Sequence, residues 1–300
     1  MYKVAVLLAS FNGEKWLEEQ VSSILAQTKV EINLFLRDDC SSDGTRDVLN
    51  SLGHESRLHV LPNRGRATGT AAGNFFEIIK ECADINVDYF FLADQDDYWY
   101  PEKISAAIEL MRKEGADCYA SNLRCVSDSQ SPRILRKDFP QTTNDFLFQG
   151  ASAGCTYGLS ARSIKYVRNV INDSSTHRVN LAAVSHDWAI YAITRSRGCV
   201  WAIDPSYYID YRQHNSNVYG ALGFKSYVKR LRLLRSGWYR ENVLNVAELC
   251  ELNSSQKRIV EAIRRGGIIG KIRLLSDCFS FRRRRSEKII MLFFIVVGFI

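Results

Sequence analysis

The chain has 300 residues, of which 46% are hydrophobic and 24% are charged. This balance is that of a globular protein, so it excludes a disordered chain and a fibrous repeat, and the length suffices for one large or two modest domains. The formal net charge of +7 is unevenly spread, because residues 221–300 carry +11 and residues 1–220 carry −4. The chain therefore has a mildly acidic first region and a strongly basic tail, and this difference predicts that the two regions bind different partners.

The eight cysteines include no C-x-x-C pair, so that zinc or redox motif is absent from the sequence. The N-terminus has neither a cationic segment nor a small-residue cleavage site, which argues against a secretory signal. These features predict a reduced cytoplasmic protein. The apolar segment 289–300 extends about 18 Å as a helix, too short for a hydrocarbon core of about 30 Å.

The first hundred residues alternate between strand and helix patterns. Strands are expected at 4–9, 32–36, 58–61 and 89–93, and helices at 16–25, after 41–44 and at 71–83. This rhythm predicts an open, mostly parallel α/β sheet, in which ligands bind at the carboxyl ends of the strands. Two acidic clusters, 38–39 and 94–97, follow strands at that edge.

The patterns beyond Pro101 are less regular. They predict a helix at 104–113, a strand at 118–126, a polar irregular stretch at 127–150 and a segment of small residues at 150–159. A helix is expected at 182–194 and short strands at 199–203 and 207–211. Basic amphipathic helices are expected at 224–234, 243–252 and 259–275.

Asp94, Asp96 and Asp97 place three carboxylates within four residues. Their mutual repulsion is costly unless a cation neutralises it. Carboxylates of this kind, together with substrate phosphates, suit Mg²⁺ or Mn²⁺. A solvated acidic turn before the next helix is the alternative, but the position after a buried strand at the ligand-binding edge favours a metal site.

A second polar segment, 38–45, follows the strand at 32–36. Asp38 and Asp39 suit hydrogen bonds to a base or to a ribose hydroxyl, whereas Ser42 or Asp43 suits the N-cap of the following helix. The two roles are compatible because different residues perform them. The sequence has no G-x-G-x-x-G after the first strand and no G-x-x-x-x-G-K-[ST], so the common dinucleotide and P-loop motifs are missing.

Three segments in this order resemble the GT-A nucleotide-sugar domain of family 2 glycosyltransferases: ASFNGEKWLEEQVSSILAQT (9–28), DDCSSDGT (38–45) and DQDD (94–97). The segments DQDDYW (94–99), SHDWAIYAIT (185–194) and YRQHNSN (211–217) are most similar to bacterial rhamnosyltransferases of surface-polysaccharide synthesis. The resemblance covers residues 3–220. It implies a GT-A catalytic domain over 1–220 with a mostly parallel central sheet, followed by a basic helical tail over 221–300.

The resemblance also implies a role for each matching residue. Asp187 corresponds to the catalytic base, and Asp96 and His214 correspond to ligands of the divalent ion. The residues implied in donor binding are Ser10, Phe11, Asn12, Asp39, Asp94, Gln95 and Arg212. From the residues alone, Asp187 also suits the first turn of a helix, where the macrodipole favours an acid, and His214 also suits an ordinary loop.

The chemistry of such a transfer matches these residue types. A nucleoside diphosphate leaving group needs a Lewis acid, and an acceptor hydroxyl needs a general base. The family mechanism, with one base and no covalent nucleophile, implies inversion at the sugar. Gly150–Gly158 suits either the floor of an acceptor site or a tightly packed strand pair. Trp99, Tyr100 and Trp188 suit either sugar stacking or the core.

The basic tail predicts contact with an anionic membrane. The segment 224–238 interleaves apolar and basic residues at helical spacing, and the run Arg282–Arg285 precedes the apolar terminus. A helical cap packed on the catalytic domain is the alternative. Nucleic acid is not expected as a partner, because the tail has no recognised motif and the rest of the chain is acidic.

The sequence thus predicts a metal-dependent inverting glycosyltransferase of cell-surface polysaccharide synthesis, bound peripherally to the inner face of the membrane. The expected donor is dTDP-rhamnose, and the expected acceptor is a saccharide that is carried on a lipid. One alternative keeps the fold but uses UDP-galactose or UDP-glucose. The other is a non-catalytic subunit that binds nucleotide sugars in a polysaccharide assembly complex.

Overall fold

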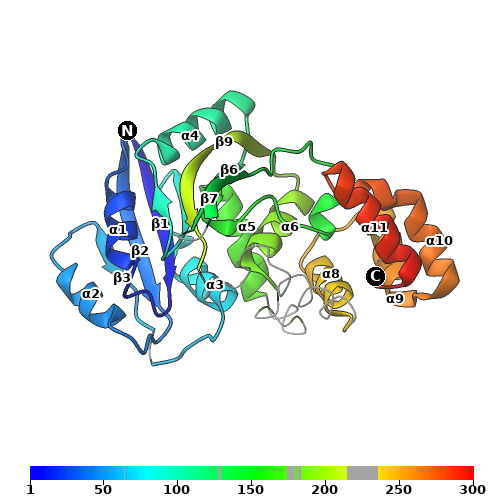
Figure 1. The fold of residues 1–300 in the computed structure, drawn as a ribbon, viewed down its shortest axis with the longest axis horizontal. Coiled ribbons are helices and arrows are strands. Elements are labelled where there is room, and N and C mark those ends of the chain that lie inside the picture. Colours follow the sequence, from blue (N-terminus) through cyan, green and yellow to red (C-terminus); the bar gives the residue numbers. More distant parts are fainter. Residues whose placement is uncertain (64, 128–129, 174–178, 180, 182–183, 215–235) are drawn as a thin grey trace.

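The computed structural model describes residues 1–300 except 64, 128–129, 174–178, 180, 182–183 and 215–235 (Figure 1). Its strands are β1 (Tyr2–Ser10), β2 (Val30–Asp38), β3 (Leu58–Val60), β4 (Tyr89–Asp94), β5 (Tyr98–Trp99), β6 (Cys118–Ser127), β7 (Gln130–Leu135), β8 (Gly158–Ser160) and β9 (Trp201–Arg212). The helices before β9 are α1 (Leu17–Leu25), α2 (Thr45–Ser51), α3 (Ala71–Cys82), α4 (Lys103–Glu114), α5 (Ala161–Asn172) and α6 (His186–Ser196). Those after it are α8 (Trp238–Glu248), α9 (Ser254–Arg265), α10 (Gly267–Asp277) and α11 (Arg285–Val297).

The strands form one sheet in the order β3-β2-β1-β4-β8-β6-β9-β5, with β7 paired to β6. The first four strands are parallel, as the sequence predicts. The other half is mixed, because β8 runs antiparallel to both β4 and β6, while β6 and β9 are parallel. The expected α/β fold is therefore present, but its sheet is parallel only in the first half.

The alternation of side chains along β1 explains the layers on the two faces of the sheet. Val4, Val6 and Leu8 pack with residues of α1 and α4, whereas Ala5 and Leu7 pack with α3, α5 and α6. Both sets are fully buried. Successive side chains of a strand point to opposite faces of the sheet. Because helices cover both faces of β1, the side chains on both sides are apolar, and the sequence of the strand is a continuous apolar run.

The strand register brings the polar strand ends together. Ser10 at the end of β1 is the partner of Asp38 in β2, and Ala9 is the partner of Asp94 in β4. The carboxyl ends of three neighbouring strands therefore meet at one edge of the sheet, as expected for a ligand-binding edge.

Several elements differ from the expectations. The irregular stretch 127–150 contains β7, whose side chains are all exposed, so no apolar alternation marks it. Helix α5 was not expected, although Ser160 caps it. The single helix 259–275 is two helices, because Gly266 and Gly267 adopt positive φ. The two short strands at 199–211 are one strand, β9.

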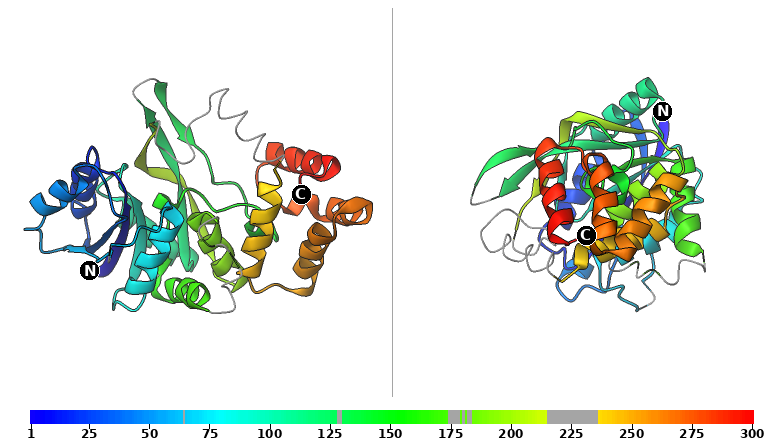
Figure 2. Two further views of the ribbon diagram at one scale, coloured as in Figure 1. Left: turned by 90° about the horizontal axis from the view of Figure 1, so that it is seen from below. Right: turned by 90° about the vertical axis from the view of Figure 1, so that its right-hand side faces the viewer.

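The C-terminal helices gather at the end of the molecule opposite β3 (Figures 1 and 2). They share one buried core with α3, α5 and α6, in which Phe281 stacks on Phe148 with ring centroids 4.1 Å apart. Met291 and Ile295 of α11 are buried in the same core. The expected helix at 224–234 lies outside the described residues. The described part of the chain includes no helix with the length and apolar character needed to cross a membrane.

Candidate active site

Gln95 joins the end of β4 to the loop that follows β1. Its Oε1 accepts hydrogen bonds from the backbone N–H of Phe11 at 2.7 Å and from the hydroxyl of Ser10 at 3.0 Å, and its Nε2 donates to the carbonyl of Phe11 at 2.8 Å. The ring of Phe11 is 54% exposed. Gln95 therefore holds the loop that carries Ser10, Phe11 and Asn12 rather than extending freely toward a ligand.

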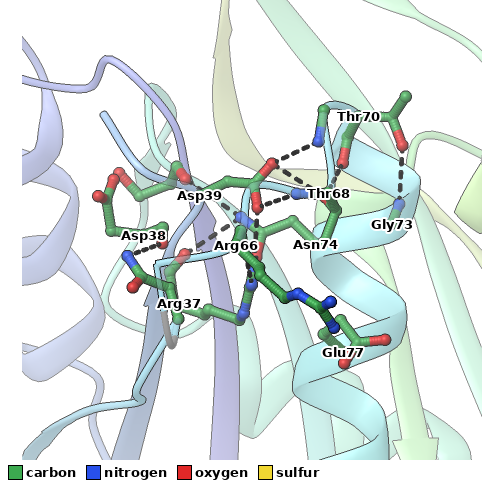
Figure 3. A network of polar contacts seen from close by, with 12 residues as sticks. Arg37, Asp38, Asp39, Arg66, Thr68, Thr70, Gly73, Asn74 and Glu77 are labelled. Atoms are coloured by element: carbon green, nitrogen blue, oxygen red, sulfur yellow. Dashed lines mark hydrogen bonds and ion pairs between the residues drawn. The ribbon is translucent and has the colours of Figure 1, made fainter. Parts of the chain in front are cut away.

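Asp39 is the centre of a buried polar network next to this loop (Figure 3). Its carboxylate pairs with Arg37 at 2.8 Å and accepts hydrogen bonds from the backbone N–H and hydroxyl of Thr68 and from the N–H of Gly69. Burial alone would raise the pKa of Asp39, but these hydrogen bonds outweigh it and hold the pKa below its usual value. Asp39 thus fixes the segment before α3.

The acidic cluster at the end of β4 contains two groups with raised pKa. Burial and then the charges of Asp96 and Asp187 raise the pKa of Asp94 to about 7. Asp97 is fully buried, and burial followed by the charges of Asp96 and Asp94 raises its pKa well above the usual value. Ligand atoms of Asp94, Asp97 and Cys155 lie within 4.8 Å of one another. The cluster therefore has the repulsion that the sequence predicts.

Asp96 lies at the more open part of the cluster, opposite His214. Its Oδ2 is 2.7 Å from Nε2 of His214, which follows β9. The structure thus brings together the two expected metal ligands although they lie 118 positions apart. Arg212, from the end of β9, pairs with Glu19 at 2.7 Å and stacks over the ring of Trp16.

A buried cation lies beneath the cluster. Nζ of Lys103 is 3.5 Å from the ring centroid of Trp99 and has no hydrogen-bond partner among the described residues. Burial lowers the pKa of Lys103 to about 7, an effect that the charges of Cys155 and Asp97 oppose. When it is protonated, Lys103 offsets part of the negative charge of Asp97.

Asp187 occupies the first turn of α6 and faces the same cluster. Its Oδ1 accepts hydrogen bonds from the hydroxyl of Ser185 and, at 2.7 Å, from the backbone N–H of Trp188. Burial raises the pKa of Asp187 to about 6, against the lowering effect of the Trp188 N–H and the charge of Lys137. A carboxyl with a pKa near the working pH is suited to general-base chemistry.

The raised pKa of Asp187 gives a pH prediction. If Asp187 is the base, only its carboxylate form is active, so kcat/KM for the acceptor falls as the pH drops through about 6 and is ~10-fold lower for each further unit. The measurement is kcat/KM from pH 4.5 to 8 at saturating donor and metal. A profile that stays level down to pH 5 contradicts the assignment.

The small residues of 150–158 are tightly packed. A Cβ on Gly154 would lie 2.2 Å from Nε2 of His186, and a Cβ on Gly158 would lie 2.7 Å from the ring of Phe91. The aromatic residues nearby also belong to the core, because Trp99 is fully buried and Trp188 packs on Tyr239. For these residues the packing alternative is the one that the contacts support.

The C-terminal arginine run enters the catalytic half of the chain. Arg283, only 8% exposed, donates to the carbonyls of Gly150 at 2.9 Å and Ala151 at 2.5 Å and lies 3.5 Å from the buried carboxylate of Asp145. Arg282 donates to Gln149 and to the hydroxyl of Tyr239. The interpretation of the whole run 282–285 as a membrane-facing segment is therefore wrong for Arg282 and Arg283, since their partners lie inside the protein.

These contacts predict a large stability effect for Arg283→Met. The variant loses one of the two arginines beside the buried carboxylate of Asp145, the other being Arg195 at 3.6 Å, and also loses the hydrogen bonds to two carbonyls. We therefore expect a loss of about 3 kcal/mol of unfolding free energy, the lower end of the range for a buried charge that loses its partner. Denaturant unfolding is the measurement, with Arg285→Met as the matched control, because Arg285 is exposed in the same run. Equal denaturation midpoints for the two variants would show that the buried contacts of Arg283 contribute nothing to stability.

The chain was compared with known proteins. The family model described as glycosyl transferase family 2 matches residues 5–171. The dTDP-rhamnosyl transferase RfbG of Shigella flexneri is 34% identical over 295 residues, which cover 97% of this chain and 99% of RfbG. The chain belongs to glycosyl transferase family 2. The Escherichia coli UDP-Glc:alpha-D-GlcNAc-diphosphoundecaprenol beta-1,3-glucosyltransferase WfaP is 29% identical over 114 residues, which cover 38% of this chain and 43% of WfaP.

The crystal structure of S. aureus TarS 1–349 in complex with UDP-GlcNAc has the same fold. It matches 99% of this chain and 80% of its own with a TM-score of 0.61 and 15% sequence identity. Family membership confirms that the protein is a glycosyltransferase, and the structural match confirms the GT-A-like fold with a helical C-terminal region.

Several residues that shape the site were missed by sequence reasoning. The network around Asp39 is built by Arg37, Thr68 and Asn74. The sequence signal that could have revealed it is Arg37, a charged residue at the end of the apolar run INLFL. Lys137 lies in a stretch expected to be irregular, and no pattern links it to Asp187. The catalytic, donor-binding and metal-binding roles of the expected residues stay predictions.

Proposed function

We propose that this glycosyltransferase moves L-rhamnose from dTDP-rhamnose to a saccharide acceptor with inversion at the sugar. The likeness to RfbG over nearly the whole length of both chains supports the donor and a place in polysaccharide synthesis. The nearness of Asp187 to the acidic cluster of β4 carries the proposal, because the charge of Asp187 acts on Asp94, one of the residues proposed to bind the donor.

In this proposal Asp187 accepts the proton of the acceptor hydroxyl as that oxygen attacks the sugar. The hydrogen bonds from Ser185 and from the Trp188 N–H hold Oδ1 in place. A positioned general base of this kind contributes ~10²–10⁴-fold to the rate. The loop of Ser10, Phe11 and Asn12, fixed by Gln95, borders the nucleotide, and Arg212 lies near the diphosphate.

The residues at the end of β4 fit a divalent ion. The carboxylates of Asp94, Asp96 and Asp97, with the imidazole of His214 beside Asp96, form a donor set for Mn²⁺ or Mg²⁺. We assign Asp96 and His214 as ligands, because Asp97 is fully buried and the thiol of Cys155 does not suit these ions. When bound, the ion neutralises the charge that grows on the nucleoside diphosphate.

The proposed acceptor is carried on a lipid, and the protein docks peripherally on the inner face of the membrane. The name of WfaP includes a diphosphoundecaprenol acceptor, which supports a lipid carrier. The C-terminal helices support docking through exposed apolar side chains, which we call the apolar face: Ile268, Ile269, Ile272, Ile289, Ile290, Phe293, Val296 and Val297. Each of these side chains is at least 47% exposed. The exposed Arg284 and Arg285 lie at the start of α11, which suits an anionic interface.

Docking through the apolar face predicts that Phe293→Glu/Val297→Glu weakens binding to vesicles. Burial of a large apolar side chain is worth ~1.5–3 kcal/mol, so the loss exceeds ~10-fold. Sedimentation with phosphatidylglycerol vesicles is the measurement. Ser254→Glu/Ser255→Glu, which adds the same charge on exposed positions of α9, is the control. Unchanged sedimentation of the first variant favours the packed-cap alternative.

A donor panel tests the proposed activity. Purified protein with Mn²⁺ or Mg²⁺ is incubated with dTDP-rhamnose, UDP-glucose, UDP-galactose or UDP-GlcNAc, and release of nucleoside diphosphate is measured. We expect release from dTDP-rhamnose above all others. If the protein instead releases UDP fastest from one UDP-sugar, that sugar nucleotide is the donor. If no nucleotide sugar yields a nucleoside diphosphate, the non-catalytic alternative is favoured.

A further inference from the structure

The side chain of Trp16 lies where the start of α1 meets the end of β9. Trp16 is half-buried and is the residue immediately before α1. The guanidinium carbon of Arg212 lies 4.4 Å from the centroid of its ring. The imidazole of His214 stacks on the same ring, with centroids 6.4 Å apart and planes inclined by 24°. One indole therefore contacts two residues that the proposed donor site uses.

Arg212 is held between two groups that belong to the same helix end. Its guanidinium lies over the ring of Trp16 and also pairs with the carboxylate of Glu19 at 2.7 Å. The Trp16 carbonyl accepts the N–H of Gln20 at 3.0 Å, so Trp16 belongs to the first turn of the helix. Trp16 and Glu19 are three positions apart and therefore lie on one face of that turn. This face fixes the Arg212 side chain, which is only 15% exposed.

His214 is held from two sides. Its Nε2 is 2.7 Å from Oδ2 of Asp96, and its ring faces the indole of Trp16. A centroid separation of 6.4 Å with nearly parallel planes is typical of offset-stacked aromatic pairs. In the part of the chain that the structure describes, β9 pairs with β6 as far as Gln213, whose N–H donates to the carbonyl of Val126 at 2.8 Å. The imidazole follows that pairing, so its side-chain neighbours determine its orientation.

An indole is suited to both contacts. The negative face of its ring attracts a guanidinium, and its flat surface limits the rotation of an imidazole that lies on it. A histidine that binds a metal needs such orientation, because neighbours that orient a ligand typically change metal affinity by ~10–100-fold. A single side chain that orients Arg212 and His214 therefore prepares the site for the diphosphate and for its ion together.

We propose that Trp16 is a positioning residue that holds Arg212 and His214 in place for the donor diphosphate and its divalent ion. The inference rests on the proposed donor site and adds to it a residue that was given no role there. Trp16 acts through its neighbours. Arg212 binds the diphosphate and His214 binds the ion, while the indole keeps both side chains oriented.

The test measures dTDP binding by isothermal titration calorimetry, once in EDTA and once at a series of Mn²⁺ concentrations. In EDTA, Trp16→Ala is expected to weaken dTDP binding ~3–30-fold, because Arg212 loses its cation–π contact. In the Mn²⁺ series, the variant is expected to need ~10–100-fold more metal for half of the full effect, because His214 is no longer oriented. Trp16→Phe keeps an aromatic face and is expected to restore most of both losses.

Double variants show whether Trp16 acts through its neighbours. In Mn²⁺, Trp16→Ala/His214→Ala is expected to need no more metal than His214→Ala alone. In EDTA, Trp16→Ala/Arg212→Met is expected to bind dTDP as weakly as Arg212→Met alone. Trp238→Ala is the matched control, because Trp238 is also a half-buried tryptophan at the start of a helix, α8. This control is expected to lose stability and to keep wild-type values in both titrations.

Three results overturn the proposal. If the losses multiply in the double variants, Trp16 contacts the donor itself. If Trp16→Ala keeps wild-type values in both titrations, Arg212 and His214 are placed without it. If Trp16→Phe loses as much as Trp16→Ala, the aromatic face is not what orients them. Thermal unfolding checks that each variant is folded, and Trp16→Leu, which keeps an apolar side chain, replaces Trp16→Ala if the latter is not.

The donor panel separates failure of this inference from failure of the proposed function. If wild-type protein releases dTDP from dTDP-rhamnose but Trp16→Ala titrates like wild-type protein, only the positioning role is refuted. If the panel shows no release from any nucleotide sugar, the proposed transfer fails, whereas the dTDP titrations still decide the role of Trp16. If dTDP binding by wild-type protein does not depend on Mn²⁺, the role of Trp16 toward His214 is refuted.

Discussion

Asp187→Asn is expected to abolish sugar transfer while donor binding persists. The amide keeps the size and the hydrogen bonds of Oδ1 to Ser185 and Trp188 but cannot accept the acceptor proton. The loss of a general base lowers kcat by ~10²–10⁴-fold. Steady-state transfer of rhamnose and calorimetric binding of dTDP-rhamnose with Mn²⁺ measure the two halves of this expectation.

Asp47→Asn is the matched control, because Asp47 also lies in the first turn of a helix, α2, and is exposed. If Asp187 merely stabilised the N-terminus of α6, both variants would lose ~0.3–1 kcal/mol of stability and neither would lose activity. Full turnover by Asp187→Asn would falsify the assignment of the base.

Asp96→Ala is expected to remove the metal dependence of donor binding. Wild-type protein should bind dTDP far more tightly with Mn²⁺ than in EDTA, whereas the variant in Mn²⁺ should behave like wild-type protein in EDTA. Loss of an outer-shell partner of a metal ligand costs ~10–100-fold in metal affinity, so we expect loss of a direct ligand to cost at least as much.

His214→Ala should show the same pattern to a smaller degree, because its Nε2 lies beside Asp96. Asp47→Ala is the control for a lost surface carboxylate. If Asp96→Ala still binds dTDP far more tightly with Mn²⁺ than in EDTA, Asp96 is not a ligand. The ion would then be assigned to Asp94 and Asp97, whose ligand atoms also lie close together.

The sequence was sufficient to predict the part of the fold that we propose binds the nucleotide. The apolar run 4–9 is a strand buried on both faces, and parallel pairing then brings Ser10, Asp38 and Asp94 to one edge. The apolar pattern of each strand and the rules for connecting parallel strands are together sufficient to predict this half of the sheet. The proximity of Asp96 to His214 required the family resemblance, because spacing alone does not bring positions 118 residues apart together.

The second half was harder because its contacts are not encoded in local periodicity. Strand β7 has no buried face, so it shows no alternation, and the mixed pairing of β8 leaves no repeated βα unit to read. The arginine run was misjudged for a related reason. A cluster of positive charge in sequence indicates solvent or an anionic surface, whereas Arg283 finds its partners in backbone carbonyls and Asp145.

The contact of Arg283 with Gly150 and Ala151 bears on protein engineering. A chimera could be built by grafting the last helices of one enzyme onto the first half of another in order to change acceptor preference. Here such a graft would cut a buried network whose other members are in the first half of the chain. A functional hybrid would have to transplant residues 136–151 together with the helices, so these two segments form one exchangeable module.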